Sequence, residues 1–146
     1  MLSLQPTHLI AFDPGDTTGV AIIQGGKPIN TYTISMQYMI NTIATKTSVF
    51  YTWKKIPIWV AEDFLLYPAK AAGQAFSKIP SAQVLGMLSV AAAMANKQLI
   101  LQRASDVKQF ATDDRIRSWG WNVQHISTHE RDAIRHALFY LFKNLK

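Results

Sequence analysis

The sequence of 146 residues contains no cysteine. This absence excludes disulfide bonds and any zinc site that depends on thiolate ligands. Long apolar runs are missing too, since the longest weakly polar run, Leu85–Ala95, is too short to span a bilayer. Residues 1–6 carry no positively charged segment followed by an apolar stretch. We therefore expect no signal peptide, no membrane attachment and a cytoplasmic location.

Acidic residues are the scarcer charged class, with nine Asp and Glu against fifteen Lys and Arg, and the formal net charge is +6. A basic surface favours polyanionic partners, nucleic acid above all, although many small basic proteins bind no nucleic acid. The content of 49% hydrophobic and 16% charged residues is typical of a globular protein. A chain of this length can bury a sizeable core, and we expect a single domain over residues 1–146.

Short apolar runs bounded by turn residues predict strands. The pair Gly25-Gly26 predicts a tight hairpin turn, because glycine readily adopts a positive φ. The nearly continuous apolar run that ends at Glu62-Asp63 predicts a central strand covered on both faces. The five predicted strands are 7–13, 20–24, 28–34, 56–63 and 98–103.

Helices are predicted between and after these strands, with Ser35 as the N-cap of the first and Ser105 as the N-cap of a short third one. An apolar stripe on the last helix is expected to face the sheet. The predicted helices are 36–44, 81–96, 105–111, a segment at 113–119 that continues the third helix or stands alone, and 128–143. This order predicts a mixed α/β sheet with helices packed against it.

Acidic residues fall at the ends of predicted elements. Asp13 ends the first strand, Glu62 ends the fourth, and Asp132 lies beside the apolar stripe of the last helix. If the first and fourth strands are neighbours, the two strand-end carboxylates lie side by side at the edge where open α/β sheets bind ligands. His129 precedes Asp132 by three residues and lies on nearly the same helix face.

Three carboxylates in a partly apolar cleft repel one another unless a cation lies between them. Oxygen ligands select Mg²⁺ or Mn²⁺. Two such ions, about 4 Å apart, could activate water and stabilise the leaving oxygen of a phosphodiester. Together with the basic surface, this pattern predicts a nuclease.

Each acidic position also has a simpler interpretation. Asp13 precedes a Pro-Gly pair and is equally good as a turn residue. Asp132 could be a surface charge that pairs with His136 or with His129, and an isolated histidine is more often structural than a ligand. Glu62 is harder to explain in this way, because a buried Glu is rare unless it is paired.

Five segments in chain order resemble motifs of the ribonuclease-H-like superfamily and, within it, of the RuvC-type Holliday junction resolvases. They are AFDPGDTTGVAI (11–22), WVAEDF (59–64), SAQVLGMLSVAAAMA (81–95), SDVKQFAT (105–112) and HERDAIRHAL (129–138). The resemblance implies a ribonuclease-H-like mixed sheet of five strands in the order 3-2-1-4-5, flanked by helices. It also implies a bacterial protein or a phage protein in an infected host.

The resemblance further implies that a catalytic centre with two Mg²⁺ ions, or Mn²⁺, is bound by Asp13, Glu62, Asp132 and His129. Lys108 would neutralise a phosphate and take part in catalysis. The implied partner is branched DNA, cut as a four-way junction by paired nicks, and the protein would be a homodimer with helix 81–96 at its interface. The residues expected to contact DNA are Phe64, Tyr67, Lys70, Phe76, Lys78, Ser81 and Lys108.

The sequence also departs from the family pattern. The turn at 13–19 is shorter and lacks the usual basic residue, Phe64 follows Glu62 by two places instead of three, and the loop 65–80 is longer. These changes affect substrate choice more than chemistry. Two other functions stay open: a YqgF-type nuclease acting on structured RNA, and a junction-binding protein without catalysis. An actin-like ATPase would need two such domains around its nucleotide.

Overall fold

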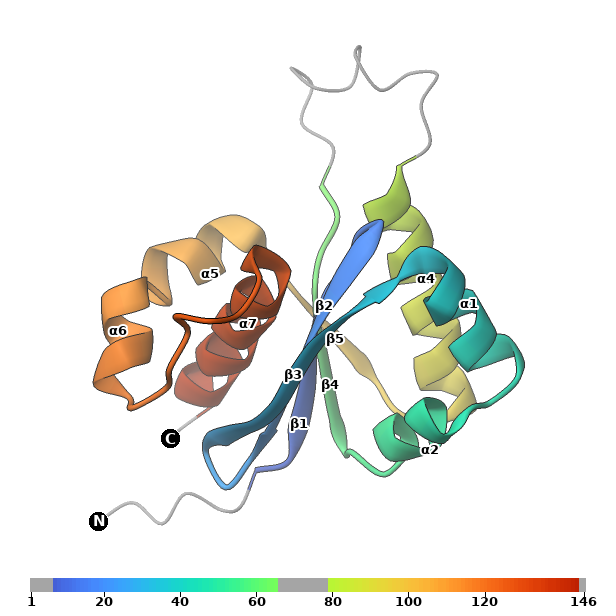
Figure 1. The fold of residues 1–146 in the computed structure, drawn as a ribbon, viewed down its shortest axis with the longest axis horizontal. Coiled ribbons are helices and arrows are strands. Elements are labelled where there is room, and N and C mark those ends of the chain that lie inside the picture. Colours follow the sequence, from blue (N-terminus) through green and yellow to red (C-terminus); the bar gives the residue numbers. More distant parts are fainter. Residues whose placement is uncertain (1–6, 66–78, 145–146) are drawn as a thin grey trace.

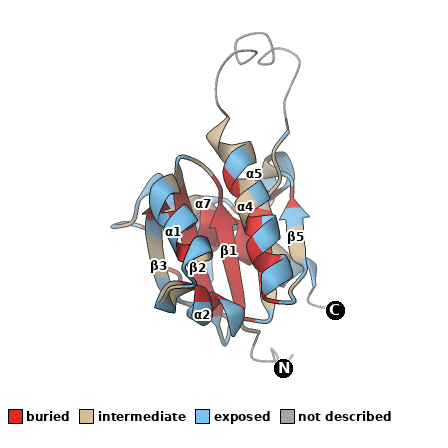
Figure 2. Cartoon of the chain, turned by 90° about the vertical axis from the view of Figure 1, so that its right-hand side faces the viewer, coloured by how far each residue is buried: buried red, intermediate tan, exposed pale blue. Residues whose placement is uncertain are grey.

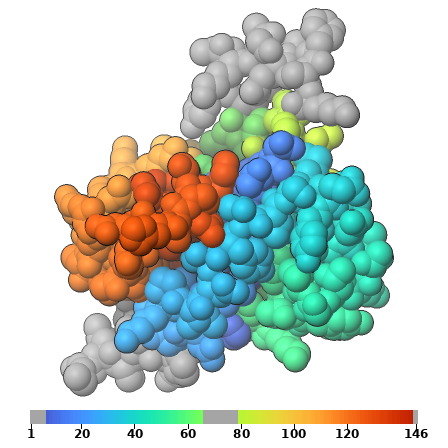
Figure 3. Space-filling model, in the orientation of Figure 1, coloured from blue at the N-terminus to red at the C-terminus, as the bar shows by residue number. Residues whose placement is uncertain are grey.

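The computed structural model describes residues 7–65 and 79–144. Figure 1 shows a sheet seen nearly edge-on between two helical layers. The sheet has five strands in the order β3-β2-β1-β4-β5, so the predicted order 3-2-1-4-5 is confirmed. In the space-filling view, the β2–β3 hairpin runs across the front of the molecule between the two helical groups (Figure 3). None of the helices in the described ranges is long and apolar enough to cross a bilayer.

The strands divide into an antiparallel and a parallel part. β1, β2 and β3 form an antiparallel meander, whereas β4 and β5 add to β1 in parallel. Gly25 and Gly26, with φ of 62° and 76°, make the two-residue turn between the paired residues Gln24 and Lys27, as predicted. The strands are β1 (Leu9–Asp13), β2 (Thr17–Gln24), β3 (Lys27–Ser35), β4 (Ile58–Glu62) and β5 (Leu99–Gln102).

The helices of the described residues begin and end close to the predicted positions. Ser35 is the N-cap of α1, since its hydroxyl accepts the Tyr38 backbone N–H. The prediction for Ser105 is wrong, because α5 begins one residue earlier and Arg103 takes the N-cap position. The sequence pattern does not predict α2. The helices are α1 (Met36–Ala44), α2 (Ser48–Lys54), α4 (Pro80–Met94), α5 (Ala104–Phe110), α6 (Asp113–Ser118) and α7 (Thr128–Lys143).

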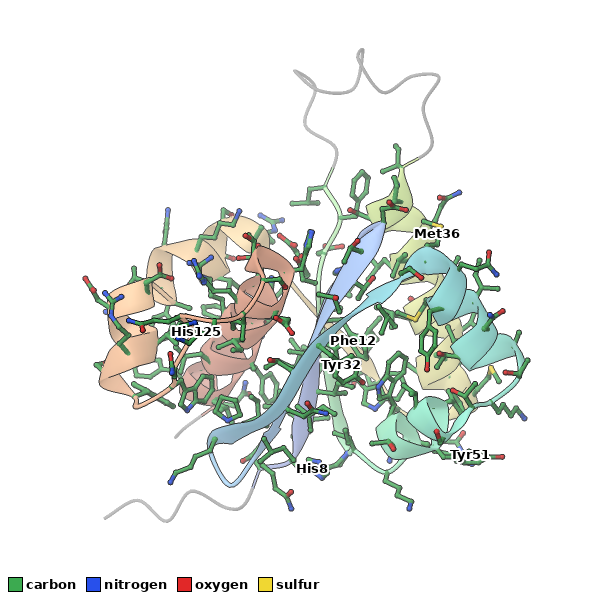
Figure 4. The ribbon with its side chains drawn as sticks, viewed as in Figure 1. His8, Phe12, Tyr32, Met36, Tyr51 and His125 are labelled. Carbon is green, nitrogen blue, oxygen red and sulfur yellow. The ribbon has the colours of Figure 1, made fainter. Side chains whose placement is uncertain are left out.

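An aromatic core fills the space between the sheet and the layer of α1, α2 and α4. The ring of Phe12 lies 5.1 Å from that of Trp53 and 5.8 Å from that of Trp59. The buried indole N–H groups are satisfied, since Trp53 donates to the Tyr32 hydroxyl and Trp59 to the Ile56 carbonyl. Figure 4 shows Phe12 and Tyr32 close together at the sheet. This layer is a packed core and supplies none of the predicted acidic ligands.

The second core lies between the sheet and α7, as the apolar stripe predicted. Alternation along β1 sends Ile10 and Phe12 into the aromatic core, whereas Leu9 and Ala11 point toward α7. In Figure 2, β1 is buried along its length between the layers. The residues of α7 packed in this core are Ala133, Ile134, Ala137, Leu138 and Leu141.

Candidate active site

Asp13 and Glu62 end two adjacent parallel strands. The β1–β4 register pairs Phe12 with Ala61, so the next residue of each strand is one of the two acids. Alternation turns both side chains to the face that α7 covers. Their carboxyl groups are hydrogen-bonded to each other. The structure thus brings together the first two predicted ligands at the expected edge of the sheet.

The environment of this carboxyl pair favours retention of a proton. Burial is the main cause that raises the pKa of Glu62 to about 8, and the hydrogen bond and the charge of Asp13 raise it further. Burial also raises the pKa of Asp13 to about 6. The charge of Asp132 raises both values and the charge of Lys108 lowers both. Near neutral pH the pair therefore retains a proton between its two carboxyl groups.

Helix α7 brings His129 to this pair. Its Nδ1 lies 3.1 Å from Oδ2 of Asp13, within hydrogen-bonding distance, and its side chain is 48% exposed. The start of α7 is fixed by a capping box, in which the Ser127 hydroxyl accepts the Glu130 N–H and the Glu130 carboxylate accepts the Ser127 N–H. Asp13 is thus more than a turn residue, because it is buried and contacts both Glu62 and the last helix.

Asp132 has a partner that the sequence interpretation missed. The alternative pairing of Asp132 with His136 or His129 is wrong, because Nη1 of Arg135 donates to Oδ1 of Asp132 over 2.6 Å. Nη2 of the same guanidinium donates to Oδ1 of Asp113, 2.5 Å away. The three-residue spacing on a helix was the available signal for the first contact.

A buried polar pair lies beside the acids and was also missed. Gln102 is the register partner of Glu62, and its Oε1 lies 3.1 Å from Nδ1 of His136, one helical turn after Asp132. Both side chains are buried. Burial, followed by the charge of Lys108, lowers the pKa of His136 to about 4. His136 therefore stays neutral at physiological pH and braces α7 against β5.

The other predicted residues divide into two groups. Lys108 is exposed on α5, and its charge acts on Asp13, Glu62 and His136. Ser81, in the first turn of α4, lies near the turn after β1, since a Cβ added at Gly15 would be 4.0 Å from its Oγ. Phe64 is partly buried just after β4. Four predicted DNA contacts lie outside the described residues: Tyr67, Lys70, Phe76 and Lys78.

The donor set suits a hard divalent cation, although residues 7–65 and 79–144 hold no preformed cluster of three or more His, Asp or Glu side chains able to bind a metal. Near neutral pH, a positive charge in place of the shared proton favours full ionisation of the hydrogen-bonded pair of Asp13 and Glu62. Carboxylate oxygens are the ligands that Mg²⁺ and Mn²⁺ prefer. The pair therefore fits such an ion.

The sheet order, the strand directions and the two helical layers define a ribonuclease-H-like fold similar to that of RuvC. Among solved structures, the chain is similar to "T. thermophilus RuvC in complex with Holliday junction substrate", with a TM-score of 0.69, 16% identity and coverage of 95% of this chain and 97% of that one. A second structure, of Thermus thermophilus RuvC, gives a TM-score of 0.62 at 16% identity, covering 94% and 97%. No family model matches the sequence, and no curated protein matches it in sequence comparison.

Proposed function

We propose that this protein is a metal-dependent endonuclease that cuts four-way DNA junctions. The observation that carries the proposal is the hydrogen-bonded pair of Asp13 and Glu62, whose shared proton marks the place for a cation. The RuvC-like fold supports it, because a protein of that fold has been solved with a Holliday junction substrate. The net charge of +6 supports a polyanionic partner.

In this proposal Asp13, Glu62 and Asp132, together with His129, hold Mg²⁺ or Mn²⁺, with two ions in the occupied site. A bound ion supplies Lewis acidity and lowers the pKa of a coordinated water. The chain's own contribution is to present carboxylates whose proton leaves when the ion binds. Burial makes the ionised pair costly by itself, so the retained proton competes with the ion and binding of the ion strengthens as pH rises.

The groups around the carboxyl pair act on the phosphate and on protons. Lys108 brings a positive charge to the rim of the site, where it offsets the charge of a scissile phosphate. His129 faces Asp13 with Nδ1, which leaves Nε2 either to bind the ion or, where the carboxylates alone hold the ion, to exchange a proton with the substrate side. His136 is neutral and buried and takes no part in proton transfer.

A second copy of the chain would supply the second nick of a symmetric pair. Three exposed apolar side chains favour such an interface: Val90 and Met94 on α4 and Leu101 on the edge strand β5. We therefore propose a homodimer through α4 and β5, with one acidic site in each copy facing the junction.

The test is a cleavage panel of four-way, three-way and flap DNAs and a structured RNA, each with Mg²⁺, with Mn²⁺ and with chelator. Wild type should make paired, symmetric nicks in the four-way junction only when metal is present. Glu62→Gln should lower the rate by about 10²–10⁴-fold and still bind the junction. Asp63→Asn is the matched control, since it changes the neighbouring carboxylate and should cut normally.

Three results would contradict the proposal in different ways. Preferred cleavage of the RNA would favour the nuclease acting on structured RNA. Tight junction binding without any metal-dependent nick would favour the non-catalytic binding protein. Normal cleavage by Glu62→Gln would show that the carboxyl pair of Asp13 and Glu62 is not needed for catalysis.

A further inference from the structure

Arg135 uses all three of its side-chain nitrogens on three separate acceptors. Nη1 donates to Oδ1 of Asp132 over 2.6 Å and Nη2 to Oδ1 of Asp113 over 2.5 Å. Nε donates to the carbonyl of Ala111 over 3.2 Å. Because the guanidinium is planar and rigid, three donors aimed at three fixed acceptors leave it one orientation. Arg135 thereby joins α7 to the corner between α5 and α6.

The burial of this contact separates it from an ordinary surface pair. The side chain of Arg135 is 19% exposed and that of Asp132 is 21% exposed. Arg117 and Asp114, with the same three-residue spacing on α6, are 54% and 89% exposed. An exposed pair of this kind contributes little to stability, whereas a partly buried arginine with a separate charge-assisted hydrogen bond to each of two carboxylates holds both partners in place. Of these two pairs with the same helical spacing, the one beside the acidic site is the less exposed.

The corner between α5 and α6 that Arg135 contacts lies next to a predicted site residue, Lys108. Ala111 follows the end of α5, which holds Lys108, and Asp113 begins α6. On Asp132, only Oδ1 accepts a hydrogen bond from the described residues, and Oδ2 accepts none of the bonds found there. One oxygen is therefore fixed and the other is left for a further partner.

We propose that Arg135 is a positioning residue for the acidic site: it holds Oδ1 of Asp132 so that Oδ2 serves a divalent cation, and it fixes the α5–α6 corner through Asp113 and Ala111. This inference rests on the proposed function, because it assigns Asp132 to the metal. Arginine is required at this position, since lysine is a point donor that cannot satisfy three acceptors in a plane.

Two other roles of Arg135 predict a different effect on metal affinity when the guanidinium is removed. If Arg135 competed with the cation for Asp132, removing the guanidinium would tighten metal binding. If Arg135 only stabilised the packing of α7 against α6, its loss would lower the stability of the fold and leave metal affinity unchanged. Metal affinity measured on the free protein therefore separates the three roles.

The experiment compares Arg135→Lys and Asp113→Asn with the wild type by calorimetric Mg²⁺ titration of the free protein, by thermal unfolding, and by single-turnover junction cleavage across Mg²⁺ concentrations. Arg135→Lys should weaken Mg²⁺ binding by about 10–100-fold, the range seen when a residue supporting a metal ligand is changed. Cleavage should recover in part at high Mg²⁺. Asp113→Asn should weaken binding by a smaller factor.

Matched controls come from the exposed pair on α6: Arg117→Lys and Asp114→Asn should leave metal binding unchanged. If Arg135→Lys does not fold, the double variant Arg135→Gln with Asp113→Asn removes the charges together and carries the same prediction. If a folded Arg135 variant binds Mg²⁺ as tightly as the wild type or more tightly, the inference about Arg135 is overturned and the proposed function is not affected. A wild type that neither binds Mg²⁺ nor cuts would overturn the proposed function and the inference with it.

Discussion

Gly19 and His129 meet backbone to backbone: a Cβ added at Gly19 would lie 1.9 Å from the carbonyl oxygen of His129 and 2.9 Å from the Glu130 nitrogen. Gly19 is also the register partner of Asp13 across the β1–β2 pair. The missing side chain therefore allows the first turn of α7 to approach the sheet beside Asp13. The 3.1 Å contact between His129 and Asp13 depends on this approach.

Substituting Gly19→Ala should move the start of α7 away from the sheet. We expect a loss of about 1–3 kcal/mol in unfolding free energy, as for other overpacked sites, and a larger proportional loss of cleavage. Urea unfolding and single-turnover kinetics measure the two effects. Gly86→Ala is the control, because a Cβ there meets nothing within 4 Å and should cost no stability. Equal behaviour of the two variants would contradict this role of Gly19.

His136 predicts a particular pH dependence of stability. Its pKa is about 4 in the folded protein and near 6.5 when unfolded. The unfolded chain therefore binds the extra proton first, and the stability due to the neutral ring, up to about 3 kcal/mol, is lost as pH falls from 6.5 through 4. Replacement by asparagine should shrink this loss, whereas His125→Asn, at an exposed site, should not. Protonation of the His136 ring above pH 6, seen by NMR, would contradict the assignment.

Lys108 is expected to act on substrate phosphate. Lys108→Ala should slow cleavage and reduce the slope of log affinity against log salt by about one, because one phosphate contact is lost. Lys54 provides the control, because α2 precedes the start of β4 whereas α5, which holds Lys108, follows the end of the parallel strand β5 (Figure 1). Fluorescence anisotropy at several salt concentrations measures the slope. If the slope of log affinity against log salt is unchanged in Lys108→Ala, this lysine does not contact a DNA phosphate.

The proposed dimer interface can be tested at one exposed valine. Val90→Asp places a charge on the apolar surface of α4 and should yield monomers that make unpaired nicks. Ile29→Asp on β3 is the matched control, because both parent side chains are 56% exposed. Light scattering after gel filtration gives the mass. A monomeric wild type, or a dimer that persists in Val90→Asp, would contradict an interface on α4 and β5.

Adjacency of the acids could be predicted because it depends on local rules. Strand alternation and parallel pairing place Asp13 beside Glu62, and both strands are visible as apolar runs that end in acids. The apolar stripe of α7 and the cap Ser35 are equally local features. For these elements the sequence pattern and the tertiary environment favour the same structure.

Contacts that depend on the placement of short helices could not be predicted. Arg135 reaches Asp113 only because α6 packs beside α7, and no periodicity fixes that placement. Helix α2 escaped prediction because it buries only Phe50 and Trp53 within one short segment. The Gln102–His136 contact depends on which residue of α7 lies over β5, and the sequence pattern does not fix that register.

The central claim is that a divalent cation replaces the proton shared by Asp13 and Glu62. Calorimetric Mg²⁺ titration at pH 7, repeated in buffers of different ionisation enthalpy, counts the protons released. Because the pKa of Glu62 is about 8 and that of Asp13 about 6, binding should release about one proton per chain. Asp63→Asn should keep this release and Glu62→Gln should lose it. No Mg²⁺ binding, or binding without proton release, would contradict the account.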